Sequence, residues 1–295
     1  MLILLDVGNT SISYAVYRKA PSAGFAATFT PLPLSTRIGL SVLRRTIGRK
    51  GVGGDPLRTA KIGSFLKEHI PKFIKKCAKS GDKYGFDIVI TSVVPKNTEI
   101  IKKYTQSFLR GRPFKIWIVG SNLHTKIRHR YQSKRLRADR AVNIFGAIRL
   151  YRPPLLMIDY GTAITADYIS RNGVFEGGLI IPGPEIALQA LIERAALLPK
   201  KIRLPKNHIS FLGRNTYECL HSGTLQGYGA LTDGLIERFR QRYGNLRVVA
   251  TGGFASHIKP YTRHLRSHVD PGHTLKSLLL LYLEKANGAW LIRRR

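Results

Sequence analysis

The sequence has little cysteine and no long apolar run, and each shortage excludes a class of protein. Its two cysteines, Cys77 and Cys219, are too few for a disulfide framework or a cysteine-ligated metal site. The longest apolar run, residues 278–283, is far shorter than the ~20 residues that span a bilayer. Asp6 also interrupts the N-terminal apolar segment before a signal-peptide core forms. We therefore expect a cytoplasmic protein with no membrane partner.

Acidic residues are also scarce, since 17 Asp and Glu stand against 49 Lys and Arg, a net charge of +32. Such a field attracts anions, including nucleotides and nucleic acids, and says nothing about fold. The densest basic segment, residues 126–140, fits three interpretations: a solvated surface, a nucleic-acid contact, or delivery of anionic substrates to Asp139. Because Asp139 lies inside the segment, the third interpretation is favoured.

Several familiar catalytic motifs are missing. The sequence contains no GxxxxGK[ST] loop, no GxGxxG, no HExxH and no GxSxG. Its nine histidines are scattered without metal-ligand spacing. These absences remove the common signatures of P-loop nucleotide hydrolases, dinucleotide-binding proteins, zinc proteases and serine hydrolases.

A pattern that is present occurs once in each half of the chain. An apolar strand leads into an acid, a glycine turn and a second strand, over residues 2–17 with Asp6 and again over residues 155–169 with Asp159. The copies are about one domain length apart, which predicts an internal repeat at the domain scale. With a boundary near Arg152, we expect an N-terminal domain of residues 1–152 and a C-terminal domain of residues 153–295.

Hydrophobic periodicity predicts an α/β chain around this repeat. Residues 19–60 are expected to form loops with short edge elements. Further strands are expected at 86–95, 114–120, 177–183 and 246–251, and helices at 63–79, 139–150, 184–199, 216–244 (interrupted by glycines) and 275–294.

The repeated turns are candidates for binding phosphate and metal. A carboxylate at a strand end, such as Asp6 or Asp159, is well placed to hold Mg²⁺. The glycines of the turns expose backbone N–H groups that cradle phosphates. The alternative is that each Asp only accepts hydrogen bonds within its turn. Two copies in matched contexts, in a chain with 17 acids, favour the functional interpretation.

Two further segments are candidates. Asp139 begins a predicted helix, where it is either an N-cap or a general base that takes a proton from a hydroxyl attacking the γ-phosphate. Its neighbour Arg140 is suited to grip an anionic group. Gly252 and Gly253 follow an apolar strand, where a nucleoside can approach the backbone.

The motifs together resemble type III pantothenate kinase, a family within the actin/hexokinase/Hsp70 ATPase superfamily that also includes the Bvg accessory factor proteins. The matching segments follow the order of the family and are residues 6–17, 91–95, 139–143, 158–169, 175–183, 212–236 and 251–255. The resemblance implies two duplicated ribonuclease H-like domains, each a mixed sheet flanked by helices, with ATP in a cleft between them.

The resemblance also implies a function. It is the in-line transfer of the ATP γ-phosphate to pantothenate, the first step of coenzyme A biosynthesis, by a homodimer. Asp139 becomes the general base, Asp6 lies near Mg²⁺, and Asp159 binds an activating monovalent cation, potassium or ammonium. The implied ATP-binding residues are Asp6, Val7, Gly8, Asn9, Thr10, Ser11, Ile12, Ser13 and Thr162. The implied substrate-binding residues are Tyr131, Arg137, Ala138, Asp139, Arg140 and Thr216.

One position departs from the family pattern. The family has Gly-x-Asp-Arg around its catalytic aspartate, whereas Arg137 stands in place of the glycine here. Either Arg137 points away from the substrate or the pocket differs. The alternative function is therefore a non-catalytic or altered-substrate member of the same fold whose basic surface binds nucleic acid.

Overall fold

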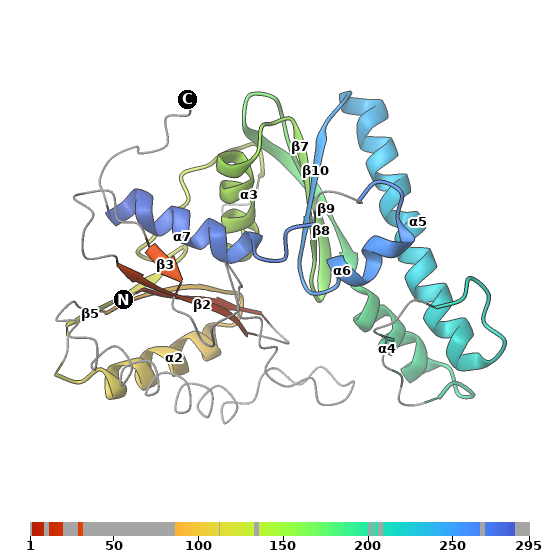
Figure 1. Cartoon of the computed structure of the whole chain (residues 1–295), viewed down its shortest axis with the longest axis horizontal. Helices are drawn as coiled ribbons and strands as arrows, with labels where there is room; N and C mark the ends of the chain where they lie inside the picture. Colours follow the sequence, from red (N-terminus) through yellow and green to blue (C-terminus); the bar gives the residue numbers. More distant parts are fainter. Residues whose placement is uncertain are drawn as a thin grey trace.

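The strands that the structure describes form two five-stranded sheets. The structure, a computed structural model, describes residues 2–8, 12–19, 29–31, 86–111, 113–132, 136–199, 202, 204–205, 209–265 and 269–286. Each sheet mixes parallel and antiparallel neighbours, and helices lie between and around the two sheets (Figure 1). The predicted α/β class is confirmed.

The first sheet contains the N-terminal hairpin. Its strands are β1 (Leu2–Val7), β2 (Ile12–Lys19), β3 (Phe29–Pro31), β4 (Phe86–Ser92) and β5 (Phe114–Ile118), in the order β3-β2-β1-β4-β5. β1 pairs antiparallel with β2 and parallel with β4. A helix that the sequence analysis did not predict, α2 (Pro95–Phe108), follows β4, and its first residue is a proline.

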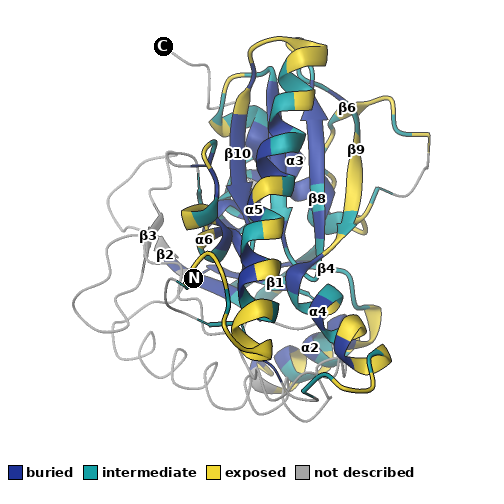
Figure 2. Cartoon of the chain, turned by 90° about the vertical axis from the view of Figure 1, so that its right-hand side faces the viewer, coloured by how far each residue is buried: buried dark blue, intermediate teal, exposed yellow. Residues whose placement is uncertain are grey.

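The second sheet repeats this arrangement. Its strands are β6 (Arg128–His129), β7 (Leu155–Tyr160), β8 (Ala163–Ile169), β9 (Val174–Pro182) and β10 (Arg247–Thr251), in the order β10-β7-β8-β9-β6. β7 pairs antiparallel with β8 and parallel with β10, as β1 does with β2 and β4. β1 and β7 also share one burial pattern, four buried residues, one half-buried residue and one buried residue. In the second sheet β8 and β10 are mostly buried, whereas much of β9 is exposed (Figure 2). The internal repeat is therefore confirmed.

The remaining helices follow the predicted positions with three differences, the first being that α6 and η1 were not predicted. They are α3 (Ala138–Leu150), α4 (Pro184–Arg194), α5 (Thr216–Tyr243), the short α6 (Ala255–Ile258) with the 3₁₀ turn η1 (Lys259–Tyr261), and α7 (His273–Ala286). α4 ends earlier than expected. α5 is continuous through its glycines, one of which, Gly229, packs so closely on Tyr261 that an added Cβ would lie 2.1 Å from its carbonyl oxygen.

α3 and α7 join the two sheets. Val142 and Phe145 of α3 share an apolar cluster with side chains of β1, β4 and α7, whereas Ile144 and Ala147 pack on β7. α7 comes from the second half of the chain yet packs on the first sheet, and β6 from the first half joins the second sheet. The boundary at residues 152 and 153 stays a prediction.

No helix among the described residues is long and apolar enough to cross a membrane. The helix predicted at residues 63–79, Cys77, and the loops predicted at 19–60 apart from β3 lie outside the described residues.

Candidate active site

Asp6 and Asp159 occupy equivalent positions at the ends of β1 and β7. Each carboxylate lies in register with a hydroxyl-bearing residue on both neighbouring strands. Asp6 lies between Ser13 and Thr91, and Asp159 lies between Thr165 and Thr251. The two phosphate-site candidates therefore share a local structure as well as a sequence pattern.

The two carboxylates also lie on the sheet faces that meet the joining helices. Side chains alternate between the faces of a strand, so Asp6 shares the face of Leu2 and Leu4, which pack with α3 and α7. By the same alternation Asp159 shares the face of Met157, which packs against α3. The expectation that the two carboxylates face each other across a bound triphosphate stays a prediction, and this arrangement favours it.

Asp159 is held by a side chain of α3 and by a close backbone turn. Its Oδ2 accepts a hydrogen bond from Nδ2 of Asn143 at 2.9 Å. Gly252 follows β10 with a φ of +92°, and a Cβ there would come within 2.4 Å of Asp159 Oδ1. This position therefore requires glycine, because a side chain would collide with Asp159 and because the positive φ is strained for any other residue. The predicted contact of Gly252 and Gly253 with a nucleoside stays a prediction.

Asp139 lies one helical turn beyond this carboxylate. Asn143 of α3 contacts the end of β7, while Ala147 packs with residues nearer its start, so α3 runs antiparallel to β7. Asp139 precedes Asn143 by four residues, which puts it on the same helix face and about 6 Å further along the axis. The base candidate thus projects past the strand end that carries Asp159.

The immediate surroundings of Asp139 differ from those of an N-cap. The N-cap residue of α3 is Arg137, without a side-chain cap, so the N-cap interpretation of Asp139 is wrong. Its Oδ1 accepts the backbone N–H of Arg140 at 2.8 Å, and its side chain is 30% exposed. The side chain of Arg137 lies beside this carboxylate, with its Nη2 3.4 Å from Oδ2 of Asp139. The Arg137 side chain is 55% exposed. A partly exposed carboxylate in the first turn is favoured by the helix dipole and stays accessible to a substrate hydroxyl.

Arg140 is buried and paired inside the protein. Its guanidinium contacts both oxygens of Asp167 on β8, at 2.5 and 3.3 Å, and lies over the rings of Tyr131 and Phe175. A Cβ at Gly178 would come within 2.2 Å of Asp167 Oδ1, so the glycine gives the pair room. Burial raises the pKa of Asp167, and the ion pair with Arg140 opposes that rise. The substrate contact of Arg140 stays a prediction.

The other predicted site residues are spread over several elements. Asn9, Thr10 and Ser11 lie outside the described residues. Val7 and Ile12 are buried, Gly8, Ser13, Thr162, Tyr131 and Ala138 are half-buried, and Thr216 is exposed at the start of α5. Thr162 accepts the N–H of Gly183 through its carbonyl at 2.9 Å. Their roles toward ATP and substrate stay predictions.

Asp6 and Asp159 fit a site in which a metal ion is bound jointly by protein carboxylates and by phosphate. No group of three or more His, Cys, Asp or Glu side chains among the described residues forms a protein-only metal site. Mg²⁺ usually binds through one or two carboxylates together with substrate phosphates and water. Asp6 and Asp159 supply such carboxylates. Beside Asp6, the buried hydroxyl of Thr91 has no hydrogen-bond partner in the described part of the chain, as expected where a ligand completes a site.

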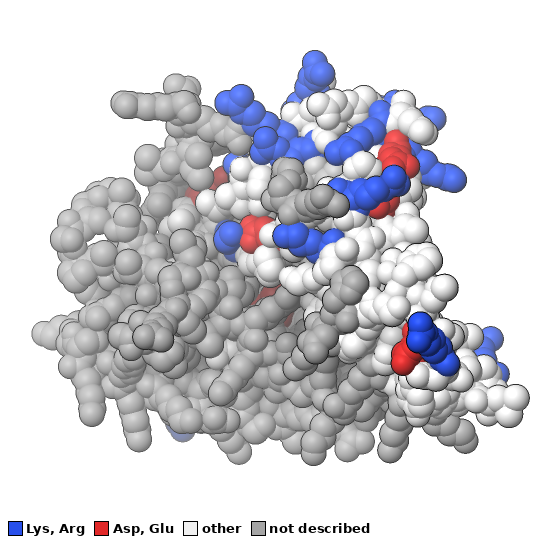
Figure 3. All heavy atoms as spheres, turned by 45° about the vertical axis from the view of Figure 1, so that its right-hand side comes forward, with Lys and Arg blue, Asp and Glu red and all other residues white. Residues whose placement is uncertain are grey.

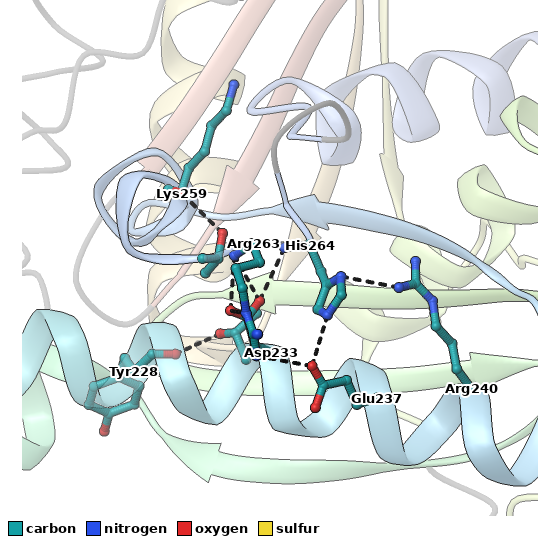
Figure 4. A network of polar contacts seen from close by, with 9 residues as sticks. Tyr228, Asp233, Glu237, Arg240, Lys259, Arg263 and His264 are labelled. Atoms are coloured by element: carbon teal, nitrogen blue, oxygen red, sulfur yellow. Dashed lines mark hydrogen bonds and ion pairs between the residues drawn. The ribbon is translucent and has the colours of Figure 1, made fainter.

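A polar network fixes the loop that leads away from Gly252. Asp233 of α5 is 6% exposed and accepts the backbone N–H groups of Arg263 and His264 at 2.9 to 3.1 Å (Figure 4). His264 also contacts Glu237 through Nε2 at 3.1 Å and Arg240 through Nδ1 at 3.2 Å. The segment after β10 is therefore anchored to α5.

Basic side chains gather at the opposite end of the second sheet. Lys and Arg side chains dominate the upper part of the face drawn in Figure 3. Exposed arginines near the strand ends farthest from Asp159 are Arg128, Arg152, Arg171, Arg242 and Arg247. Such a field attracts ATP and other anions from a distance.

Three of the buried polar residues that were not identified from the sequence make the polar contacts described above. They are Asn143, Asp167 and Asp233. A signal existed for two of them. Asn143 follows Asp139 at the four-residue spacing of one helix face, and Asp167 is an acid within an apolar strand.

Comparison with known proteins gives one consistent family. A family model described as Type III pantothenate kinase matches residues 2–238. A curated Type III pantothenate kinase of Zymomonas mobilis is 32% identical over 296 residues, covering 97% of this chain and 94% of its own. That of Citrifermentans bemidjiense is 35% identical over 199 residues, covering 66% and 76%, and that of Syntrophus aciditrophicus is 31% identical, covering 96% and 98%. Among solved structures, a non-polymerisable ParM mutant aligns over 95% of this chain and 98% of its own, at 10% identity and a TM-score of 0.43.

Proposed function

The chain belongs to the type III pantothenate kinase family, and from that premise we propose that it phosphorylates pantothenate to 4'-phosphopantothenate with ATP. Membership makes the protein an enzyme, a kinase that uses ATP and, as is typical of kinases, a divalent metal. Our proposal extends to the proton acceptor, the monovalent cation and the quaternary structure. The alternative, a non-catalytic or altered-substrate protein that binds nucleic acid, has no support from these relatives.

Asp139 accepts the proton of the substrate hydroxyl in this proposal. The hydroxyl oxygen attacks the γ-phosphorus in line with the departing ADP. The turns after Asp6 and Asp159 hold the phosphates through backbone N–H groups. Binding therefore aligns the γ-phosphate with the attacking hydroxyl before the reaction, which lowers the entropic part of the barrier. Mg²⁺, when bound, supplies neutralisation of the phosphate charge.

One observation carries the assignment of Asp139. Its carboxylate is partly exposed in the first turn of α3, one turn beyond the Asp159 carboxylate, while the neighbouring Arg140 is buried. Of the two charged side chains, Asp139 is therefore the one that a substrate hydroxyl can reach. A general base must lie within hydrogen-bond reach of the proton that it takes.

The test is turnover by Asp139→Asn, followed as ADP release with pantothenate, Mg²⁺ and ATP. We expect kcat to fall by ~10²-fold or more, because the amide cannot accept the proton. Glu185→Gln is the matched control, since it also removes a first-turn acid from a helix, α4, and is expected to keep its turnover. Near-normal kcat in Asp139→Asn, with a folded protein, would refute the role.

We also propose that Asp159 binds potassium or ammonium. A half-buried carboxylate beside the phosphate turn is a suitable oxygen ligand for such a cation. The same assay without potassium and ammonium is expected to show reduced turnover, and unchanged turnover would contradict the cation requirement.

A homodimer is the last part of the proposal. Large apolar side chains are exposed on β9, on α4 and the turn after it, on the segment before α5 and at the start of α5. They are Leu179, Ile180, Ile186, Leu191, Leu197, Phe211, Leu212 and Tyr217. A surface of this kind is typical of a protein interface. Light scattering is expected to give a dimer for the wild type and a monomer for Ile180→Glu, whose side chain is 61% exposed. A monomeric wild type would contradict the proposal.

A further inference from the structure

The side chain of Asn143 is buried at the meeting point of three elements. It is 2% exposed on α3, and its Nδ2 donates to Asp159 Oδ2 at the end of β7 at 2.9 Å. Its Oδ1 accepts the hydroxyl of Thr274, in the first turn of α7, at 2.8 Å. The backbone carbonyl of the same residue accepts Nε2 of His273 at 2.9 Å. One residue therefore ties the Asp159 carboxylate to α3 and α7 together.

These partners leave the amide only one orientation. A carboxylate only accepts hydrogen bonds, so it must face the amide nitrogen, and the Thr274 hydroxyl can then donate to the amide oxygen. In the flipped orientation the amide oxygen would face the Asp159 carboxylate, and two hydrogen-bond acceptors would then lie against each other. Because the amide is fully buried, losing either bond would also leave a polar group without a partner.

The anchoring continues into the first sheet. α7 shares its apolar cluster with Leu2 and Leu4 of β1, the strand that ends in Asp6. Asp139 lies on the same face of α3 as Asn143, one turn earlier. The amide is thus fixed relative to both strand-end carboxylates and to the base candidate.

We propose that Asn143, held by Thr274, is a positioning residue for phosphoryl transfer that fixes the orientation of the Asp159 carboxylate. This inference rests on the proposed function, because it takes Asp159 as a ligand on the nucleotide side of the reaction. Hydrogen bonds that orient a metal-ligating carboxylate typically change affinity or activity by about 10–100-fold when they are removed.

Asn143→Leu is the sharpest test, because it keeps the approximate shape and removes the donor to Asp159 without placing a second carboxylate beside it. We expect Mg·ATP affinity, measured by calorimetry, and kcat each to fall by about 10–100-fold. The concentration of potassium that half-activates the enzyme should rise. The KM for pantothenate should stay unchanged, because Asp159 acts on the nucleotide side.

Ser277→Ala is the matched control for damage to the helix contact. Ser277 lies at the same interface of α3 and α7. Its hydroxyl donates to the His273 carbonyl at 2.7 Å and lies 3.4 Å from His273 Nε2, so its loss leaves the bonds of Asn143 to Asp159 and Thr274 in place. We expect this variant to keep wild-type kcat and Mg·ATP affinity. A general loosening of α3 would instead affect both variants and would raise the KM for pantothenate.

The outcomes separate this inference from the function on which it rests. A wild-type chain that neither binds Mg·ATP nor phosphorylates pantothenate would overturn both. An active wild type beside an Asn143→Leu variant with unchanged kcat and Mg·ATP affinity would overturn only the role of Asn143. If Asn143→Leu does not fold, Thr274→Val decides. A reduced kcat at unchanged pantothenate KM supports the inference, and wild-type kinetics overturn it.

Discussion

Arg140 and Asp167 form a buried two-point ion pair, with Nη2 of the arginine 2.5 Å from one carboxylate oxygen and Nε 3.3 Å from the other. Their side chains are only 6% and 1% exposed, so neither charge has water as an alternative partner. The pair connects the first turns of α3 to the middle of β8. It therefore fixes the helix that carries Asp139 to the second sheet.

The first prediction concerns the stability that depends on this pair. Arg140→Met would leave the Asp167 carboxylate buried without a counter-charge, which costs about 3–5 kcal/mol of unfolding free energy. Arg130→Met is the control, because Arg130 pairs with Glu176 on the same sheet but is 77% exposed. A pair at that exposure contributes about 0–1 kcal/mol. Urea denaturation of the two variants measures both values, and equal losses would contradict the structural role of the buried pair.

The second prediction concerns the contact between α3 and α7 at Gly146. A Cβ there would lie 1.7 Å from the Oγ and 2.4 Å from the Cβ of Ser277. Alanine normally stabilises a helix by about 0.8–1 kcal/mol relative to glycine. We expect Gly146→Ala to destabilise the protein by about 1–3 kcal/mol instead, because the packed helices must separate.

The sign of the effect makes this prediction sharp. A Cβ added at Gly227 in α5 would meet nothing within 4 Å, so Gly227→Ala should gain stability. Ser277→Gly in the Gly146→Ala background should restore part of the loss, since it removes the clashing atoms. A stabilised Gly146→Ala, measured by thermal unfolding, would show that the helices do not approach this closely.

The sequence predicted the elements well where local pattern decides them. The apolar runs before Asp6 and Asp159 became β1 and β7, and the three- and four-residue spacing after Asp139 became α3. α2 was not predicted because Pro95 ends the expected strand, although proline is also favoured in the first helical turn.

The features that could not be predicted depend on contacts between residues that are far apart in the sequence. The glycines of α5 predicted interruptions, yet Gly229 packs on Tyr261 within a continuous helix. The burial of Arg140 depends on Asp167, which comes from a strand 27 residues later, and no local pattern pairs them. The placement of α7 on the first sheet is likewise a contact between the two ends of the chain.

The last prediction is a pH dependence that comes from His273. Its side chain is fully buried and donates Nε2–H to the Asn143 carbonyl. Burial lowers its pKa below the ordinary value of about 6.5, the nearby Lys276 acts in the same direction, and the Asn143 carbonyl and Asp270 oppose the shift. The folded protein thus keeps the ring neutral at pH values where the unfolded chain already binds a proton.

The sign follows from proton linkage. Because the unfolded state binds more protons below pH 6.5, the contribution of this histidine to stability is complete above that pH and is lost as the pH falls toward the folded-state pKa. The loss approaches about 1.4 kcal/mol per pH unit. His273→Gln keeps an N–H donor but cannot titrate, so its unfolding free energy should fall less steeply between pH 7 and pH 5. Denaturation of both proteins across this range measures the difference, and a constant gap would show that His273 titrates equally in the folded and unfolded states.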